Sequence, residues 1–362
     1  MRTMKGLNLL SAIVVLITGL IIGLIVLLVS NANQAFPAFS TILTFGFSSL
    51  RHLGNVLLHA TPIILTGLSV AFAFKTGLFN IGATGQFTLG GFVAIFLGIH
   101  LEFLPAPLRI LVAITTAAAA GALWGAVPGL LKAFRNVHEV ISCIMMNYIG
   151  MFFVNYLIIN FLFDSHHTTS IRIPSSSALP TFGMQNFFRD NVRTSDINIG
   201  IIIAILIAVL VYVIIEKTTF GYELKACGFN KDAAKYAGIS QNRNIVFSLM
   251  ISGALAGMGG ALFFLNDTGL RLNTIDALRM EGFTGISVAF LGLNHPIGII
   301  FSGILVSYLL LGGSQLQRFG FSLEIVEIVI AVIIYFCAFV FLVKNFLAKG
   351  INKIFRKAGD ES

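Results

Sequence analysis

The residues of this chain that are best suited to chemistry are amides and hydroxyls that interrupt long apolar runs. Asn80, Thr84, Gln86 and Thr88 lie among glycines in "GLFNIGATGQFTLGG", residues 77–91. A buried amide without a partner costs free energy, so these side chains either bond freed backbone groups or face a polar cavity. Neutral donors and acceptors of this kind suit hydrogen bonding to an uncharged polar solute.

A second polar position lies in "NVHEVISCIMMNYIG", where Glu139 and Asn147 are eight residues apart. Eight residues are about two helical turns, so one helix would present both side chains on the same face. The Glu139 carboxylate either faces the protein interior on the same side as Asn147 or interacts with the N-terminus of the helix. Asn136 is the expected N-cap of this helix.

Motifs of the common enzyme classes are missing from the sequence. It has no Gly-Lys dipeptide, hence no Walker A loop for ATP, and no H-E-x-x-H, paired C-x-x-C or G-x-S-x-G pattern. His166 and His167 are adjacent, so in an extended chain they point opposite ways and would not chelate one metal. Cys143, Cys227 and Cys337 indicate small buried side chains, not a disulfide framework. We therefore predict no catalytic site, no metal and no cofactor.

The composition indicates a membrane protein with an all-α fold. Of the 362 residues, 57% are hydrophobic and only 10% are charged, which exceeds what a soluble domain of this length can bury. A span needs about 20 apolar residues, and a central charge costs about 2.5–3.5 kcal/mol, so charges mark the gaps between spans. The ten expected spans are 7–29, 54–74, 81–98, 108–131, 140–163, 198–215, 244–265, 283–294, 296–313 and 323–343. The third and the eighth are short, so each is either a full crossing or a broken or re-entrant helix.

Basic residues predict the orientation, because cytoplasmic loops accumulate lysine and arginine. With ten spans and the N-terminus inside, fifteen of the 23 basic residues lie inside, whereas the reverse leaves eight. The fifteen are Arg2, Lys5, Lys75, Lys132, Arg135, Lys217, Lys225, Lys231, Lys235, Arg243, Lys344, Lys349, Lys353, Arg356 and Lys357. We expect both termini in the cytoplasm and the loop 164–197 outside. The net charge of +8 then follows from topology beside an anionic inner leaflet and requires no nucleic acid.

Two glycine-punctuated apolar segments hint at related halves. They are 77–98 and 282–303, and each follows a longer span in its half of the chain. Repeated halves with interrupted helices build the central site of many transporters. The alternative is the ordinary use of glycine where membrane helices pack closely.

The stretch "EKTTFGYELKACGFNKDAAKYAGIS", residues 216–240, concentrates charge between apolar spans. Gly228 is expected to interrupt a helix, Asn230 to cap the next one, and Gly238 to follow its end as C′. The capped helix has about seven residues, or roughly 10 Å, so it cannot cross a bilayer.

A helix this short is marginal in water and needs a packing partner. Its alanines form a small-residue face that favours docking on a cytoplasmic protein over binding to lipid headgroups. The residues predicted for this contact are Gly228, Asn230, Ala233, Ala234, Lys235 and Gly238.

Four blocks in order make the sequence similar to a transporter family. "GYELKACGFNKDAAKYAGIS" with "NIVFSLMISGALAGMGGAL" after it resembles the coupling-helix region of permease subunits of bacterial ABC importers, in the branched-chain amino acid and ribose-type permease family. "KTGLFNIGATGQFTLGG", "NVHEVISCIMMNYIG" and "GISVAFLGLNHPIGI" resemble further blocks of its nucleoside and simple-sugar branch. The resemblance covers about residues 50–345. Thr84 stands where an acid is common in the family, and His138 where asparagine is common, so a role that needs charge at position 84 does not carry over.

The resemblance implies a set of partners and a cellular location. It implies a separate cytoplasmic ATPase, often with two cassettes in one chain, a second homologous permease, and an extracellular binding lipoprotein that delivers the substrate. The location would be the bacterial cytoplasmic membrane.

We therefore predict a permease that imports nucleosides by alternating access. Uncharged amides and hydroxyls suit a neutral nucleoside, and 34 phenylalanines could stack on a base. The residues predicted to line or support the pathway are Asn80, Gln86, Glu139 and Asn147. One alternative is a related importer of ribose, galactose or another small solute. Another is an ion-coupled secondary transporter, which the scarcity of acids disfavours, because the predicted spans hold only Glu324 and Glu327.

Overall fold

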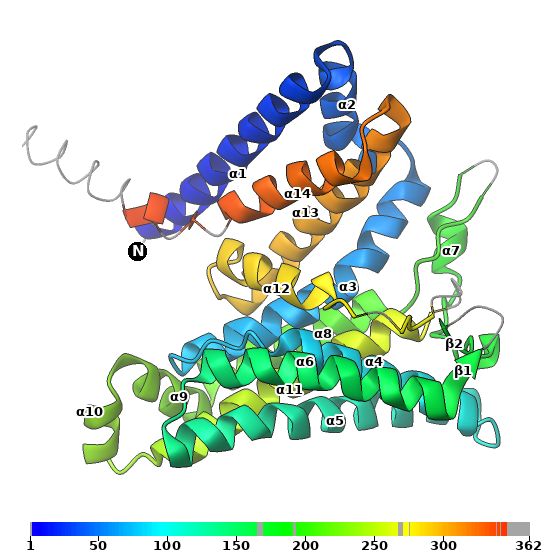
Figure 1. The fold of residues 1–362 in the computed structure, drawn as a ribbon. Helices are drawn as coiled ribbons and strands as arrows, with labels where there is room; N and C mark the ends of the chain where they lie inside the picture. Colours follow the sequence, from blue (N-terminus) through cyan, green and yellow to red (C-terminus); the bar gives the residue numbers. More distant parts are fainter. Residues whose placement is uncertain are drawn as a thin grey trace, which may run out of the picture.

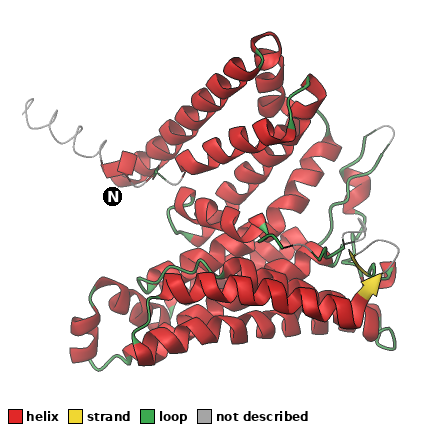
Figure 2. Cartoon of the chain, in the orientation of Figure 1, coloured by secondary structure: helices red, strands yellow, loops and turns green. Residues whose placement is uncertain are grey.

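The computed structural model describes residues 2–164, 169–190, 193–266, 271–274, 276–337, 339–340 and 342–345. His166, His167 and the basic residues of the tail beyond 345 lie outside these ranges. The described chain is almost wholly helical, which confirms the all-α prediction (Figures 1 and 2). Its two strands, β1 Phe163–Asp164 and β2 Thr169–Ser170, pair antiparallel.

Fourteen α-helices follow one another in the described chain. They are α1 Arg2–Ser30, α2 Ala32–Thr44, α3 Leu50–Lys75, α4 Ala83–His100, α5 Ala106–Arg135, α6 Glu139–Leu157, α7 Met184–Phe187, α8 Gly200–Lys217, α9 Thr219–Phe229, α10 Lys231–Tyr236, α11 Gln241–Phe264, α12 Met280–Leu291, α13 Pro296–Ser314 and α14 Leu323–Cys337. A π-helix, η2 Ile158–Leu162, extends α6, and three 3-10 turns are η1 Phe45–Phe47, η3 Ser175–Ser177 and η4 Gln315–Phe319.

Eight helices of the described residues are long and apolar enough to cross a membrane. These candidate spans start within α1, α3, α4, α5, α6, α8, α11 and α13. α12 is a shorter apolar helix of 12 residues, about 18 Å long, well below the roughly 30 Å of a bilayer core. The number of complete crossings stays a prediction.

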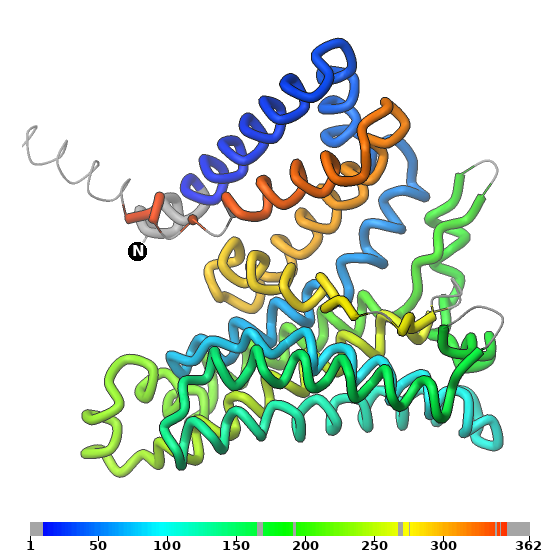
Figure 3. The backbone as a smooth tube through the Cα atoms, viewed as in Figure 1, coloured from blue at the N-terminus to red at the C-terminus, as the bar shows by residue number. Residues whose placement is uncertain are grey.

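The helices form two packed groups (Figures 1 and 3). The larger core is built mainly from α3, α4, α5, α8, α11 and α12, with one face of α13. A smaller core joins α1, α2, the end of α13 and α14. α2 has no counterpart among the expected spans, because its 13 residues include Pro37 and several polar side chains. Figure 1 shows α2 folded back beside the end of α1.

α11 crosses α4 and α5 in direct backbone contact. A Cβ on Gly257 or Gly253 would overlap the backbone of α5, and a Cβ on Gly90 of α4 would overlap Gly257. Small residues permit this approach, and close packing drives helix association in membranes. The glycines therefore place α11 at the centre of the larger group.

The two glycine-rich segments that resemble each other in sequence differ in local structure. Residues 76–82 are non-helical and lead into α4 at Ala83. Residues 282–303 form most of α12, a tight turn and the start of α13. Leu293 and Asn294 of that turn have positive φ angles of 56° and 53°. The relation between the two halves stays a prediction.

Two glycines of α4 give a matched test of the helix crossing. Gly90→Ala would force α4 and α11 apart, because the new Cβ would overlap the Gly257 backbone. At Gly98 the nearest heavy atom to a new Cβ is 3.5 Å away, an ordinary contact. We expect Gly90→Ala to cost about 1–3 kcal/mol of stability and Gly98→Ala to be tolerated. Thermal unfolding in detergent would measure the difference, and equal melting curves would contradict it.

Candidate functional site

Asn80 lies inside the larger helix group, bonded by side chains of α3, α4, α6 and α11. Its Nδ2 donates to Oε1 of Gln86 at 2.8 Å and to Oγ of Ser252 on α11 at 2.7 Å. Ser252 also meets Ser69 of α3, with 3.0 Å between their hydroxyl oxygens. Asn80, Gln86, Ser69 and Ser252 are each at most 1% exposed. The network ties the non-helical segment 76–82 to α3, α4 and α11.

Asn147 of α6 bonds the backbone where α4 begins. Its Oδ1 accepts from the Gly85 N–H at 2.8 Å, and its Nδ2 donates to the Ile81 carbonyl at 3.0 Å. Both backbone groups lie beside the break before α4, where helical partners are missing. Asn147 therefore stabilises the non-helical segment from α6.

Glu139 lies apart from this network. Its carboxylate pairs with Nζ of Lys132 at 2.8 Å, joining the start of α6 to the end of α5. The cap of α6 is His138, whose Nδ1 accepts from the Val140 N–H at 3.3 Å. The expected N-cap, Asn136, was wrong. It ends α5 in the left-handed conformation, with φ 52°.

Of the four predicted pathway residues, the structure brings together Asn80, Gln86 and Asn147. Their amide groups are bonded within the protein, as buried polar groups generally are, so their part in a pathway stays a prediction. Asn147 bonds backbone groups that lack helical partners, which is one of the two roles expected for buried amides in this chain.

Two cavities that border α3 and α11 contain polar side chains in their walls. One of about 220 Å³ includes Asn55, Asp196 and Asn266 in its wall. A second of about 500 Å³ extends to α12 and α13 and is lined mainly by apolar side chains, with Arg279, Glu281 and Thr284 as polar positions. Both are also lined by His59 and Phe263. We name these two adjoining cavities the polar cleft.

Asn55 and His59 of α3 contribute polar side chains to the cleft, and Arg51, one turn earlier, lies outside its lining. Arg51, Asn55 and His59 are spaced four residues apart, so they lie in a row along the helix. Arg51 donates from Nε to the Thr194 carbonyl at 3.2 Å, and Asn55 Oδ1 accepts from the Asp196 N–H at 3.2 Å. The spacing was visible in the sequence. The expected boundary of the span at 54 separated Arg51 from the other two.

The start of α12 reaches the other side of the cleft. The Glu281 carbonyl accepts from Oγ1 of Thr66 at 3.1 Å, and Gly282 packs against Thr84. Thr66 is 16 residues after Leu50, about 24 Å along α3, so Glu281 lies at the depth of a span. The sequence placed the start of this span at 283 and therefore missed Glu281 as an acid inside the helix group.

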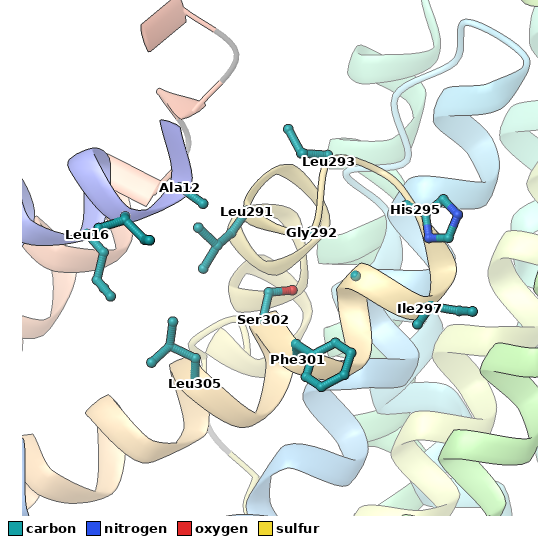
Figure 4. Close-up of a pocket in the computed structure, with 12 residues that line it drawn as sticks. Ala12, Leu16, Leu291, Gly292, Leu293, His295, Ile297, Phe301, Ser302 and Leu305 are labelled. Atoms are coloured by element: carbon teal, nitrogen blue, oxygen red, sulfur yellow. The ribbon is translucent and has the colours of Figure 1, made fainter. Parts of the chain in front are cut away.

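A third cavity, of about 680 Å³, has no charged or amide side chain in its lining, and His295 and Ser302 are its polar residues. Figure 4 shows Ala12 and Leu16 of α1 opposite Leu291 and Leu305 across this cavity. Ser302 contributes a hydroxyl to its wall, but that hydroxyl donates to the Val288 carbonyl at 2.8 Å. This lining suits acyl chains better than a polar solute.

At the other end of α11, α9 and α10 form the charged region. Oδ1 of Asn230 accepts from the N–H groups of Asp232 and Ala233 at 3.0 and 3.1 Å, and Gly238 has φ +78°. The predicted cap and C′ glycine are therefore confirmed, and the capped helix α10 has six residues. Gly228 was wrong as a helix break. It lies within α9, where a Cβ would overlap the Lys75 carbonyl, so glycine allows α9 to pack on the end of α3.

α10 exposes aromatic side chains rather than a face of three alanines. Tyr236 is 95% exposed, and Phe229 just before the helix is 89% exposed. Ala233 and Ala237 are exposed, but Ala234 is 3% exposed and faces its own chain. The prediction that Ala234 belongs to the docking surface is thus corrected. Lys235 is exposed on this helix.

α9 is fixed to α11 by a small polar cluster. Oε2 of Glu223 accepts from Nη2 of Arg243 and from Nδ2 of Asn244, each at 3.1 Å. Asn244 also lies 3.7 Å from Sγ of Cys227, and burial raises the pKa of that thiol. Lys225 and Glu216 pair at 3.0 Å between α9 and α8. α10 therefore connects through α9 to three long helices.

The family model for the permease component of the branched-chain amino acid transport system matches residues 52–338. The chain belongs to this permease family. With eight helices of spanning length among its described residues, this permease is a multi-pass membrane protein. No solved structure gives a significant match.

Several curated relatives of the permease are ABC transporter subunits. It is 40% identical to the guanosine ABC transporter permease protein NupP of Bacillus subtilis (strain 168), over 94% of this chain and 96% of the relative. It is 35% identical to the nucleoside ABC transporter permease protein NupB of Lactococcus lactis subsp. cremoris (strain MG1363), over 93% and 92%. The glucose ABC transporter permease protein TsgB13 of Haloferax volcanii is 29% identical, over 90% and 85%.

Gln86 gives a test of the supporting role of the buried network. Gln86→Ala leaves Asn80 without one buried partner, which costs about 1–3 kcal/mol. We expect the amount of folded permease and its transport to fall together. Transport per folded molecule is the deciding measurement, with Gln317→Ala, an exposed position, as control. A selective loss of transport at unchanged yield would place Gln86 in the pathway instead.

Proposed function

We propose that this permease is one of two membrane subunits of an ATP-driven importer that carries nucleosides into a bacterial cell. The observation that carries the proposal is the similarity, over nearly the whole chain, to a guanosine permease and a nucleoside permease. The polar cleft is consistent with it, because its wall combines hydrogen-bonding groups with the aromatic ring of Phe263. A nucleoside offers both a polar edge and a flat face for stacking.

The orientation follows the distribution of basic residues, with both termini in the cytoplasm. α9 and α10 then lie on the cytoplasmic side, and the segment 163–199 lies outside. A separate ATPase, with two cassettes in one chain, would dock on α10, and the permease itself would hydrolyse no ATP. An extracellular lipoprotein would deliver the nucleoside to the outer end of the polar cleft, near Asp196.

A second, homologous permease would complete the pathway. Beside the cleft, a cavity of about 710 Å³ is lined by Thr284, Ser287, Glu324, Glu327 and Tyr335 of α12 and α14. Two exposed carboxylates on an apolar helix such as α14 would be costly against lipid and call for a protein neighbour or water. This surface is therefore the proposed contact with the second permease.

Alternating access would begin at α10. ATP-driven movement of the docked ATPase would displace α10, and the contacts of α9 with α3, α8 and α11 would pass the movement to the walls of the cleft. Such coupling requires that docking favour one of two global states over the other.

A sugar importer is the second candidate function, since a glucose permease is also a relative. Uptake of labelled guanosine, adenosine and uridine by cells that carry or lack this gene separates the two. We expect deletion to abolish most nucleoside uptake at low concentration, with no competition from unlabelled ribose, glucose or leucine. Unchanged nucleoside uptake together with reduced sugar uptake would reject the nucleoside assignment and keep the permease assignment.

Tyr236 provides the test of the ATPase contact. An exposed aromatic side chain that docks in a groove is commonly worth about 2 kcal/mol or more, so Tyr236→Ala should reduce ATPase binding at least about tenfold. Phe187→Ala removes an exposed ring from α7, far along the chain from α10, and should have no such effect. The measurement is the ATPase that copurifies with each variant, together with uptake. Full ATPase recovery and uptake with Tyr236→Ala would exclude this residue from the contact.

A further inference from the structure

We infer that Arg279, Glu281 and His59 form a base subsite, which binds the hydrogen-bonding edge of the nucleobase as the substrate passes. This inference rests on the proposed nucleoside transport and assigns the residues that recognise the base. The three side chains line one cavity of about 500 Å³, within the usual range of about 300–1,000 Å³ for small-molecule sites.

The two charged groups of the subsite remain available to a ligand. Nη1 of Arg279 lies 3.9 Å from Oε1 of Glu281, whereas a charge-assisted hydrogen bond is about 2.7–2.9 Å long. Within the described part of the chain, the other contact of the Arg279 guanidinium is the face of Phe264, 5.0 Å from the ring centroid. The guanidinium has five N–H donors, and among the described residues none of them has a hydrogen bond within the usual distance.

The depth of this pair argues for a role in transport. Charged side chains at the depth of a membrane span are costly and, where they occur, face a cavity or a pathway. The backbone below the pair is held firmly, by the Thr66 hydrogen bond to the Glu281 carbonyl and by the contact between Gly282 and Thr84. The first turn of α12 therefore presents Glu281 from a fixed position, as a recognition site requires.

The chemistry of the pair matches a base edge that places a donor beside an acceptor. The Glu281 carboxylate would accept from a ring N–H, and the Arg279 guanidinium would donate to the neighbouring carbonyl oxygen. Guanine and hypoxanthine present this edge as N1–H and O6, and guanine adds a 2-amino group for the second carboxylate oxygen. A free sugar has no such edge. The ring of His59, at the junction of the two cavities, is placed to meet the solute on its way to this pair.

The test compares guanosine with inosine, which lacks the 2-amino group. Glu281→Gln keeps the size of the side chain and replaces one accepting oxygen with a donor. The complex of permease, ATPase and binding lipoprotein is reconstituted in proteoliposomes, and initial uptake of each nucleoside is measured per assembled complex. The same lipoprotein serves wild type and variant, so a change in the guanosine-to-inosine ratio belongs to the permease.

We expect Glu281→Gln to lower guanosine uptake about tenfold or more and inosine uptake less, with ATP hydrolysis stimulated by the lipoprotein as in wild type. Glu102→Gln, an exposed acid between α4 and α5, should change neither ratio nor rate. Arg279→Lys keeps the charge without the planar fork and should lower uptake of both nucleosides. Should Glu281→Gln fail to assemble, Glu281→Asp retains the carboxylate on a shorter stem and should still shift the ratio.

The outcomes separate this inference from the proposed function. In one outcome, the wild-type complex takes up nucleosides while the Glu281 variants keep the same guanosine-to-inosine ratio. That result overturns the base subsite and leaves the proposed nucleoside importer intact. Absence of nucleoside uptake by the wild-type complex overturns both. A ratio shifted in the Glu281 variants, with normal ATP hydrolysis, supports the subsite, because a purely structural defect would lower both nucleosides alike.

Discussion

Bonding of the buried, non-helical backbone between α3 and α4 is the constraint on which the rest of this permease depends. Residues 76–82 leave helical geometry inside the helix group, and buried backbone of this kind must find hydrogen-bond partners within the protein. Asn147 supplies two of these bonds, and Asn80 anchors the segment to Ser69 and Ser252. With this segment fixed, α4 can begin at Ala83, and Thr84 in its first turn provides the surface on which Gly282 and the start of α12 pack. This network therefore fixes the position of α12, which lines the polar cleft, although none of the network's own side chains lines that cleft.

α11 connects the two ends of the proposed mechanism. Near its start Asn244 bonds Glu223 of α9, at its middle Ser252 bonds Asn80, and near its end Phe264 lies beneath Arg279. Glycine contacts with α4 and α5 hold this helix by backbone packing, which leaves little freedom for bending. A displacement at α9 would therefore reach the cleft as movement of a rigid element. Movement of whole packed helices is a common way to carry a signal between distant sites.

The sequence was sufficient for the fold class, the long helices and the ends of α10. Long apolar runs separated by charges are a strong signal, and Asn230 and Gly238 act through backbone rules that depend only on neighbours. α2 was missed because a 13-residue helix with Pro37 is too short and too polar to register as a span. Gly228 was wrongly predicted to break a helix because its role is to allow close contact with Lys75, 153 positions earlier. The local sequence gives no sign of such a contact.

Site residues were harder to predict, because burial and partners decide what a polar side chain does. Asn80 and Gln86 attract attention as amides in apolar sequence, yet they bond each other at 2.8 Å. Glu281 was placed in a loop because it lies two positions before the expected start of a span, and only its contact with Thr66 reveals its depth. The row of Arg51, Asn55 and His59 carried a readable four-residue spacing, but which helix faces the row is a matter of tertiary packing.

A transport site must bind its solute and also release it, and the Arg279–Glu281 pair suits this requirement. An isolated charge at this depth would be strongly destabilised without a ligand. The empty site would then have a high free energy, and a bound solute would leave it slowly. Two opposite charges 3.9 Å apart compensate each other when the cleft is empty, yet they are too far apart to use all their hydrogen-bonding capacity. A nucleobase bound at this pair would form hydrogen bonds with both side chains. Its net gain in free energy would be limited, because these bonds partly replace the attraction between the two charges. Weak, reversible binding of this kind is what passage requires, since a site that holds too tightly slows the exit of its solute.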